Sequence, residues 1–323
     1  MAVLKKIGKI ALIVLIVIVG VFLLVFGGVN LLKFAIYDSY YKIKTDICDN
    51  PGLNDGFICQ GICAYEAGTT DTADDKILVS GYMMDDSASR IYVTDLHSNA
   101  YYVTLKNPNG TDYTGHAGGI AVNGDTAYIA NGSKIHTLAL SAILSAKNGD
   151  TITIESQTKV NNSASFIYAN DNYLYVGEFN DGGAYRTSHP YDSTEGKNYA
   201  IVSRYSYTDL TKPDRVYSIR NNVQGICFTA DGKVVMSTSR GLSDSVYYVY
   251  DESEATDSGL TLDGAPVYFM GELKKQIKGP AMAEGIDEYN GKIITLSESA
   301  SNKYIFGKFF FANKIVGLDI KNA

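Results

Sequence analysis

The chain has 323 residues, of which 46% are hydrophobic and 20% are charged, and its formal net charge is -7. This is the composition of a globular protein with enough apolar material for a core. The acidic balance excludes nucleic acid as a partner, because phosphate binding requires a cationic face. Tyrosine is abundant and proline is rare, with 25 and 6 residues, which favours pleated sheets.

The first predicted element is a membrane segment. Residues 10–32 read IALIVLIVIVGVFLLVFGGVNLL and carry no charge, and a run of this length can cross a hydrocarbon core of about 30 Å. Lys5, Lys6 and Lys9 precede it, which favours a cytoplasmic amino terminus at residues 1–9. A cleaved signal peptide is the alternative, but we find no convincing small-x-small cleavage site. We therefore expect an uncleaved signal-anchor, a single pass through the cell membrane and an extracytoplasmic, extracellular-side body.

A short stalk is predicted next, at residues 33–56, with a strand-like run at residues 40–47. Cys48 and Cys59 flank a turn-rich stretch at its end and could form a disulfide, because an exported body permits one. The chain has no Cys-x-x-Cys motif and no Cys/His cluster, so we do not expect a zinc site.

Beyond the stalk, one short phrase built around Gly-Ile recurs five times. The clearest copies are residues 60–65 (QGICAY) and 224–229 (QGICFT), and the weaker ones are residues 118–122 (GGIAV), 165–169 (SFIYA) and 284–289 (EGIDEY). In the four later copies a turn and a second β-rich run follow. The copies are spaced by roughly 45 to 60 residues, which is typical of a propeller blade.

The phrase, a hairpin turn such as Asp231-Gly232-Lys233 and an apolar second strand such as residues 234–236 (VVM) resemble the β-propeller superfamily. The nearest groups are the strictosidine-synthase-like, gluconolactonase-like and NHL-type repeat propellers. The resemblance implies an all-β, five-bladed β-propeller over residues 57–323, preceded by one transmembrane helix, with six blades as the alternative. The last repeat lacks an outer strand, and the run at residues 40–47 could supply it and close the ring.

Propeller geometry also predicts a site, because first-strand starts and second-strand ends of all blades meet at one mouth of the central channel. The residues at these positions are Gln60, Tyr82, His116, Asn131, Glu178, Gln224, Arg240, Glu284 and Glu298. Convergent polar groups in a concave site favour ligand binding. Each residue also has a structural alternative. The glutamates could be solvated ends of strands, the glutamines could hydrogen-bond backbone groups, and the histidine could have a structural role. We expect a small molecule or a protein to bind at this mouth.

Catalysis is the second hypothesis. Glu178, Glu298 and His116 are the candidates in a metal-assisted hydrolase of a lactone, ester or glycoside. Glu178, Glu284 and Glu298, together with Asn131, could also supply oxygen ligands to Ca²⁺, the one cofactor considered. No complete catalytic set and no Gly-x-Ser-x-Gly elbow are recognisable. The sequence therefore favours a binding protein over an enzyme, because propellers host many functions on one fold.

Two further features bear on the mouth. The polar insertion at residues 180–197 follows Glu178 and is predicted to hang over the channel, as a lid or as a plain surface loop. His97, His136 and His189 have no recognisable partner in the sequence and are predicted to be surface residues.

Overall fold

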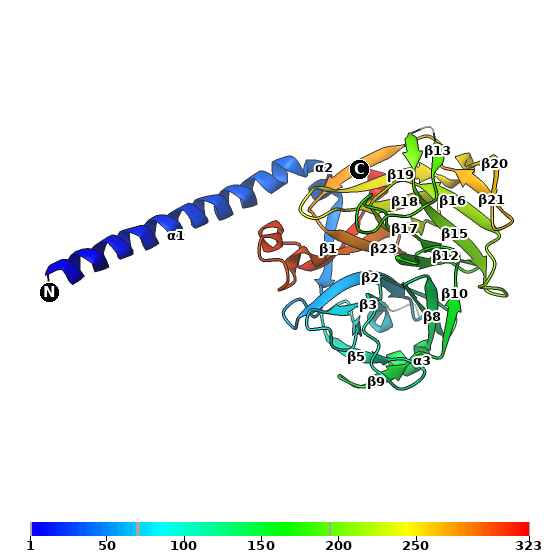
Figure 1. Cartoon of the computed structure of the whole chain (residues 1–323), viewed down its shortest axis with the longest axis horizontal. Helices are drawn as coiled ribbons and strands as arrows, with labels where there is room; N and C mark the ends of the chain where they lie inside the picture. Colours follow the sequence, from blue (N-terminus) through cyan, green and yellow to red (C-terminus); the bar gives the residue numbers. More distant parts are fainter. Residues whose placement is uncertain (1, 69–71, 194, 323) are drawn as a thin grey trace.

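The protein is a five-bladed β-propeller with one long amino-terminal helix, α1 (Ala2–Ile36) (Figure 1). The computed structural model describes residues 2–68, 72–193 and 195–322. Five sheets form the blades, and their innermost strands contact one another in a closed ring. The prediction of an all-β propeller with five blades is confirmed.

The blades follow the chain order. The first contains β2 (Phe57–Tyr65), β3 (Lys76–Met83), β4 (Arg90–Thr94), β5 (Ala100–Lys106) and β9 (Thr151–Thr153). The second contains β6 (Gly119–Asn123), β7 (Thr126–Asn131), β8 (Lys134–Ala139) and β10 (Ser156–Lys159). The third contains β11 (Phe166–Ala169), β12 (Tyr173–Gly177), β15 (Ala200–Ser206) and β16 (Arg215–Ile219), extended by β21 (Ala265–Phe269) and β20 (Thr256–Leu262).

The last two blades have four strands each. The fourth contains β17 (Val223–Phe228), β18 (Lys233–Thr238), β19 (Ser245–Asp251) and β22 (Lys275–Gly279). The fifth contains β23 (Ala283–Tyr289), β24 (Lys292–Ser297), β25 (Lys314–Leu318) and β1 (Lys44–Asp49). The remaining elements are α2 (Asp38–Ile43), α3 (Leu140–Leu144), the hairpin β13 (Tyr191–Ser193) and β14 (Gly196–Asn198), and short 3₁₀ turns that include η3 (Glu298–Ala300) and η4 (Gly307–Phe310).

The recurring Gly-Ile phrase has a steric origin. A Cβ atom on Gly61 of β2 would lie 2.5 Å from the backbone nitrogen of Ile120, and one on Gly119 of β6 would lie 2.5 Å from that of Ile167. The glycines therefore let the innermost strands of neighbouring blades approach backbone to backbone. The isoleucines that follow are buried around the axis at positions 62, 120, 167, 226 and 286. The repeat signal in the sequence is thus the signal of a narrow ring.

The ring is closed by a strand from before the first blade. β1 pairs antiparallel with β25 and completes the fifth blade. This strand starts at Lys44 and not at residue 40, because residues 38–43 form α2 and bury Tyr40 and Ile43. Tyr37 is also buried, and its hydroxyl donates to Asp244 Oδ1 at 2.9 Å. Where a stalk was predicted, the chain packs on the propeller directly after α1.

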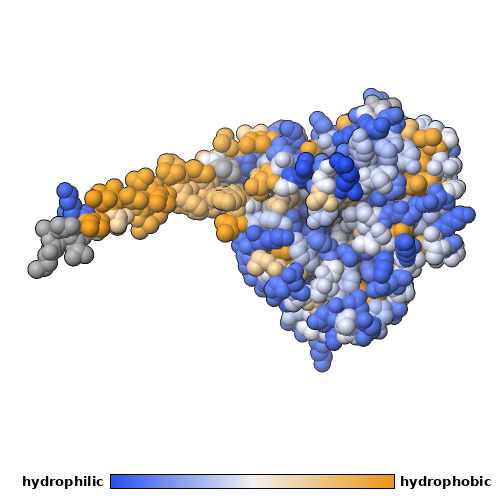
Figure 2. Space-filling view, in the orientation of Figure 1, coloured by the Kyte–Doolittle hydropathy of each residue, from blue (hydrophilic) through white to orange (hydrophobic). Residues whose placement is uncertain are grey.

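Helix α1 projects from the propeller and is apolar along most of its length (Figures 1 and 2). Residues Lys5–Ile36 are long and apolar enough to span a membrane, and the apolar window within them is not covered by the rest of the protein. An apolar face that is exposed all round is unstable in water, so this helix requires an apolar environment.

Two expectations from the sequence are corrected here. All four cysteines are free thiols, so the predicted Cys48–Cys59 disulfide is absent from the structure. The two residues lie in different blades: Asn50 Nδ2 donates to Cys59 Sγ at 3.3 Å, while Cys48 lies beside Thr94 and burial raises its pKa to about 11. His136 is buried beside Tyr113 and is not a surface residue.

Candidate functional site

The innermost strands run between two cavities at opposite ends of the propeller axis. The first, of about 620 Å³, lies at the starts of these strands and contains Glu284 and Glu298; we call it the glutamate mouth. The second, of about 720 Å³, lies at their ends and contains Asp287 and Glu288; we call it the aspartate mouth. The buried glycines and isoleucines of the ring lie between them.

The glutamate mouth collects most of the residues that the repeat pattern pointed to. It is lined by Gln60, Tyr82, His116, Asn131, Gln224, Arg240, Glu284 and Glu298, which are all the predicted binding residues except Glu178. Position within the repeat decides which end of the channel a residue faces, so the sequence was sufficient to group them.

Two carboxyl groups form the buried part of this mouth. Glu284 lies on β23 and Glu298 follows β24, and both side chains are buried. Burial, together with the neighbouring charge of Glu298, raises the pKa of Glu284 well above its usual range. Burial also raises the pKa of Glu298 to about 7. Two carboxylates in one dry site cannot both ionise readily, so near neutral pH the pair keeps a proton.

Amide and hydroxyl groups hold the acid pair in place. Gln60 Nε2 donates to Glu298 Oε2 at 3.0 Å, and Gln224 Nε2 donates to Glu284 Oε1 at 3.4 Å. The Tyr304 hydroxyl also hydrogen-bonds Glu298. The two glutamines that open the clearest repeats therefore serve as donors to carboxyl groups of the fifth blade.

A second cluster joins an imidazole, a phenol and an ammonium group. Lys303 Nζ donates to the Tyr82 hydroxyl, and the rings of Tyr82 and His116 lie 4.4 Å apart between centroids. Partial burial and the charge of Lys303 lower the pKa of His116, so its imidazole is neutral at pH 7. Asn131 Oδ1 fixes this segment by accepting a hydrogen bond from the backbone N–H of His116 at 3.0 Å.

The rim of the glutamate mouth is formed by loops. The predicted lid insertion does reach the mouth, where Tyr185, Arg186 and Thr187 line the cavity. Arg240, on the connection between β18 and β19, also lines the rim. Backbone N–H groups of Gly183 and Tyr185, with a smaller contribution from Arg240, lower the pKa of Asp181.

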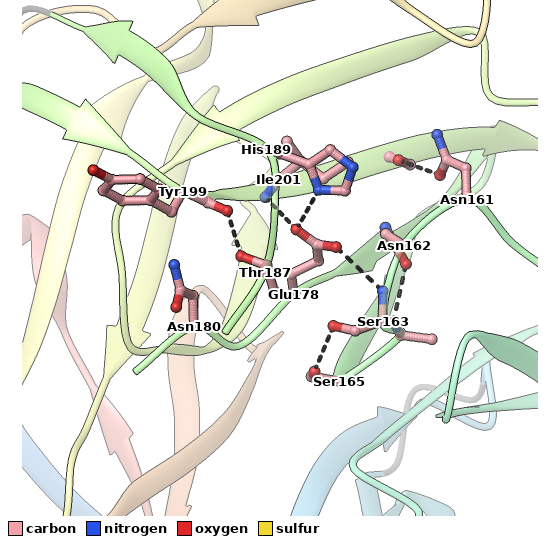
Figure 3. A network of polar contacts seen from close by, with 12 residues as sticks. Asn161, Asn162, Ser163, Ser165, Glu178, Asn180, Thr187, His189, Tyr199 and Ile201 are labelled. Carbon is pink, nitrogen blue, oxygen red and sulfur yellow. Dashed lines mark hydrogen bonds and ion pairs between the residues drawn. The ribbon is translucent and has the colours of Figure 1, made fainter. Parts of the chain in front are cut away.

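Glu178 belongs to the support of the lid and not to the cavity wall (Figure 3). Its Oε2 accepts from His189 Nδ1 at 2.9 Å and from the Ile201 N–H at 3.2 Å, and its Oε1 accepts from the Ser163 N–H at 3.3 Å. Glu178 therefore ties the insertion to β15 and to the segment before β11. His189, predicted as a free surface residue, is the partner that draws this side chain away from the axis.

The predicted Ca²⁺ ligands do not assemble. The carboxylate oxygens of Glu178 are taken up by its own three donors, and Asn131 Oδ1 accepts the His116 N–H. Within the described residues, no group of three or more His, Cys, Asp or Glu side chains is arranged to hold a metal ion. The glutamate pair offers a proton-sharing site and not the several oxygen ligands that Ca²⁺ requires.

Sequence reasoning missed Lys303 and Tyr304. Both follow η3 in the long connection between β24 and β25, outside the repeated phrase, and both line the glutamate mouth. The aromatic and basic composition of residues 303–311 (KYIFGKFFF) is the signal that could have drawn attention to them.

The aspartate mouth uses its carboxylates differently. Asp287 Oδ2 accepts the Ala64 N–H at 2.9 Å, and Glu288 Oε2 accepts the Ala230 N–H at 2.8 Å. These bonds connect β23 to the two neighbouring blades. Burial raises the pKa of Asp287 to about 7, although its second oxygen also accepts the Glu288 N–H at 2.8 Å. The acids here act as ties between blades.

Comparisons with known proteins add similarity of fold only. No protein-family profile and no curated protein matches the chain. Similar solved structures include the PQQ-bound aldose sugar dehydrogenase of Streptomyces coelicolor, at 14% identity and a TM-score of 0.41, with 78% of this chain and 76% of that chain covered. A chain of the nidogen/laminin complex is similar at 11% identity and a TM-score of 0.39, covering 75% and 73%. The Dos1 propeller is similar at 13% identity and a TM-score of 0.34, covering 73% and 52%. At these values the likenesses carry no information on ligand or activity, and the propeller assignment rests on the sheets of the protein itself.

Proposed function

We propose that the protein is a membrane-anchored, extracytoplasmic binding module whose ligand enters the glutamate mouth. The observation that carries the proposal is the buried pair of Glu284 and Glu298, placed in a cavity of about 620 Å³ and held mainly by side chains that also face the cavity. Titratable groups with shifted pKa values in a concave site are a general mark of function.

The chemistry of the mouth suits a small polar ligand. A carboxyl pair that retains one proton presents a donor and an acceptor together, which fits hydroxyl groups. Lys303 and Arg240 add positive charge at the rim, which fits an anionic group on the same ligand. A protein partner would have to present the same groups on a protruding segment.

Anchoring rests on α1 and its charges. The uncharged run at residues 10–32 is preceded by Lys5, Lys6 and Lys9, and this asymmetry favours a cytoplasmic amino terminus. The propeller would then lie outside the cytoplasm.

A second candidate function is hydrolysis of a lactone, ester or glycoside. One observation favours it: Glu298, with its pKa raised to about 7, and His116, with its pKa lowered, line the same cavity and could serve as acid and base. The step is proposed without a metal ion, because Glu178, one of the predicted metal ligands, does not line this cavity.

The test uses the full-length protein in detergent micelles. Thermal-shift and calorimetric screens with polyols, sugar acids, lactones, aryl esters and aryl glycosides should find a class that binds. Glu298→Gln and Glu284→Gln should each weaken that binding by roughly tenfold or more, because each removes a charge-assisted hydrogen bond. Glu66→Gln, which makes the same charge change at the aspartate mouth, should leave it unchanged.

The outcomes separate the two candidates. Turnover of a substrate that is lost in Glu298→Gln and in His116→Asn favours the hydrolase. Saturable binding without turnover favours the binding module. Binding that survives both glutamate substitutions but is lost in Glu66→Gln would contradict the choice of mouth.

A further inference from the structure

The exposed apolar side chains of the propeller are gathered at one end. Outside α1, the exposed large hydrophobic residues of the described chain are Met84, Tyr185, Tyr199, Leu242, Leu260, Ile305, Phe306 and Phe311. All of them except Leu260 lie on connections between the second and third strands of the blades. These connections surround the glutamate mouth, so the opposite end of the propeller lacks such a collection among the described residues.

The strongest concentration is the connection between β24 and β25. Residues 304–311 (YIFGKFFF), which we call the aromatic loop, expose Ile305 by 75% and Phe306 by 71%. Gly307 docks this loop on η3, because a Cβ atom there would lie 2.4 Å from the Ser299 carbonyl oxygen. The exposed side chains are therefore held outward on a fixed support.

The aromatic loop lies beside α1 (Figure 1). The Phe309 ring is 5.8 Å from that of Phe22, and the Phe311 ring is 4.9 Å from that of Phe26, measured between centroids. The Lys33 ammonium lies 4.8 Å from the centroid of the Phe311 ring. The loop thus contacts the part of α1 that is predicted to cross the membrane.

The level of these contacts places the loop below the membrane surface. Lys33 is the first charge after the apolar run and would lie near the lipid headgroups. At a rise of about 1.5 Å per residue, Phe26 and Phe22 lie roughly 10 and 16 Å from Lys33 along the helix. The outer half of a hydrocarbon core of about 30 Å includes the position of Phe26, and Phe22 lies close to the bilayer centre. Lys308 can extend to the headgroups from within the loop.

The connection between α1 and the propeller is too short for the aromatic loop to move away from the membrane. α1 ends at Ile36, and Tyr37 is already buried against the propeller with its hydroxyl on Asp244. Asp244 lies on the connection between β18 and β19, of which Arg240 and Gly241 line the glutamate mouth. The end of the propeller that holds this mouth is therefore fixed next to the exit of α1.

We infer that the aromatic loop inserts into the outer leaflet of the bilayer that α1 crosses, so that the glutamate mouth faces the membrane surface. This inference rests on the proposed membrane anchor. Lipid is the occupant that fits, because the loop exposes isoleucine and phenylalanine beside a membrane-spanning segment and carries a lysine suited to headgroups. A ligand would then reach the glutamate mouth from the membrane surface. The polar headgroup of a lipid is positioned to do so.

The absence of tryptophan from the chain provides a direct test. Phe306→Trp introduces a single fluorophore at an exposed position of the aromatic loop. Phe22→Trp reports on α1, and Tyr65→Trp reports on the aspartate mouth. Each full-length variant is reconstituted into phosphatidylcholine vesicles with and without lipids brominated along the acyl chains, and tryptophan emission is compared.

We expect brominated lipid to quench most of the emission of Phe22→Trp and of Phe306→Trp, and to leave that of Tyr65→Trp unchanged. Quenching of Phe22→Trp without quenching of Phe306→Trp would overturn loop insertion while leaving the anchor intact. It would indicate a protein segment as the partner of the loop. Quenching of neither would overturn the anchor and the inference together. Quenching of Tyr65→Trp would overturn the orientation.

Discussion

The glutamate mouth and the aspartate mouth lie at the two ends of the same five strands and have similar volumes, about 620 and 720 Å³. Each holds a carboxyl group whose pKa is raised to about 7, the buried Glu298 in one and the half-buried Asp287 in the other. Their hydrogen-bond partners differ. Asp287 accepts backbone N–H groups of two strands, whereas Glu298 faces the side chains of Gln60 and Tyr304 and a second carboxyl group.

A shifted pKa therefore does not by itself identify a functional site. A carboxylate that satisfies backbone donors stabilises the fold, because those donors would otherwise be buried without a partner. A carboxyl pair that is held by cavity-facing side chains lowers the stability of the fold, and the binding of a ligand to the pair can offset this loss. Substitutions at matched positions of the two mouths can test this distinction.

The largest change in stability is expected in the innermost strands, which run between the two mouths. Gly61→Ala places a Cβ atom 2.5 Å from the backbone nitrogen of Ile120, so the two innermost strands must separate. We expect the free energy of unfolding to fall by about 3 kcal/mol or more, as for severe overpacking. Urea denaturation measures it. Gly183→Ala, which meets only ordinary contacts, should change stability by less than about 0.5 kcal/mol. Similar values for both would refute the steric origin of the Gly-Ile phrase.

At the aspartate mouth, Asp287→Asn should destabilise the protein by about 1–3 kcal/mol at pH 4, where the raised pKa of Asp287 contributes little, because an oxygen that accepts an N–H is replaced by an NH₂ group. The N–H groups of Ala64 and Glu288 cannot then both find an acceptor. Chemical denaturation at pH 4 is the measurement. An unchanged or increased stability would show that these two hydrogen bonds do not support the fold.

At the glutamate mouth, Glu298→Gln should raise the stability of the protein above neutral pH. The native pKa of about 7 exceeds the usual value near 4.5, so the native state retains a proton that the unfolded state releases as pH rises from 4.5 to 7. Wild-type stability therefore falls across this window, by about 1.4 kcal/mol for each unit of pKa difference.

The variant lacks this dependence on Glu298 and should be more stable than wild type at pH 8, by about 1–3 kcal/mol, and similar to it at pH 4. Unfolding curves at several pH values check this. A variant that is less stable than wild type at pH 8 would show that the Glu298 carboxylate has a structural role.

The smallest effect is expected at the lid. Glu178→Gln replaces an ionic partner of His189 while keeping one oxygen for a backbone donor. Global stability should change by about 1 kcal/mol, but amide hydrogen exchange in residues 180–197 should accelerate. Exchange that accelerates equally around the whole ring would contradict a role confined to the lid.

The propeller could be predicted from the sequence because the close contact between neighbouring innermost strands leaves a local, repeated pattern. Four of the five innermost strands carry a glycine where a neighbouring strand approaches, at positions 61, 119, 225 and 285, and only the third has a larger residue, Phe166. The same periodicity assigned eight mouth residues to one end, since strand direction fixes the end that each residue faces.

The errors come from contacts that no local pattern records. Glu178 occupies the predicted position, yet His189 from the insertion binds it away from the axis. Residues 40–43 read as a strand but form a helix, because Tyr40 packs on Tyr247 of the fourth blade. Lys303 and Tyr304 belong to a connection outside the repeat, so periodicity could not place them at the mouth.

The protonation state of Glu298 most directly tests whether the glutamate mouth holds a carboxyl pair that shares a proton. Infrared difference spectra between wild type and Glu298→Gln, recorded from pH 4 to pH 9, isolate the carbonyl stretch of this carboxylic acid from that of Asp287. We expect a protonated Glu298 that titrates near pH 7, because its side chain is buried beside Glu284. A band that is already lost by about pH 5, as for an ordinary glutamate, would contradict it.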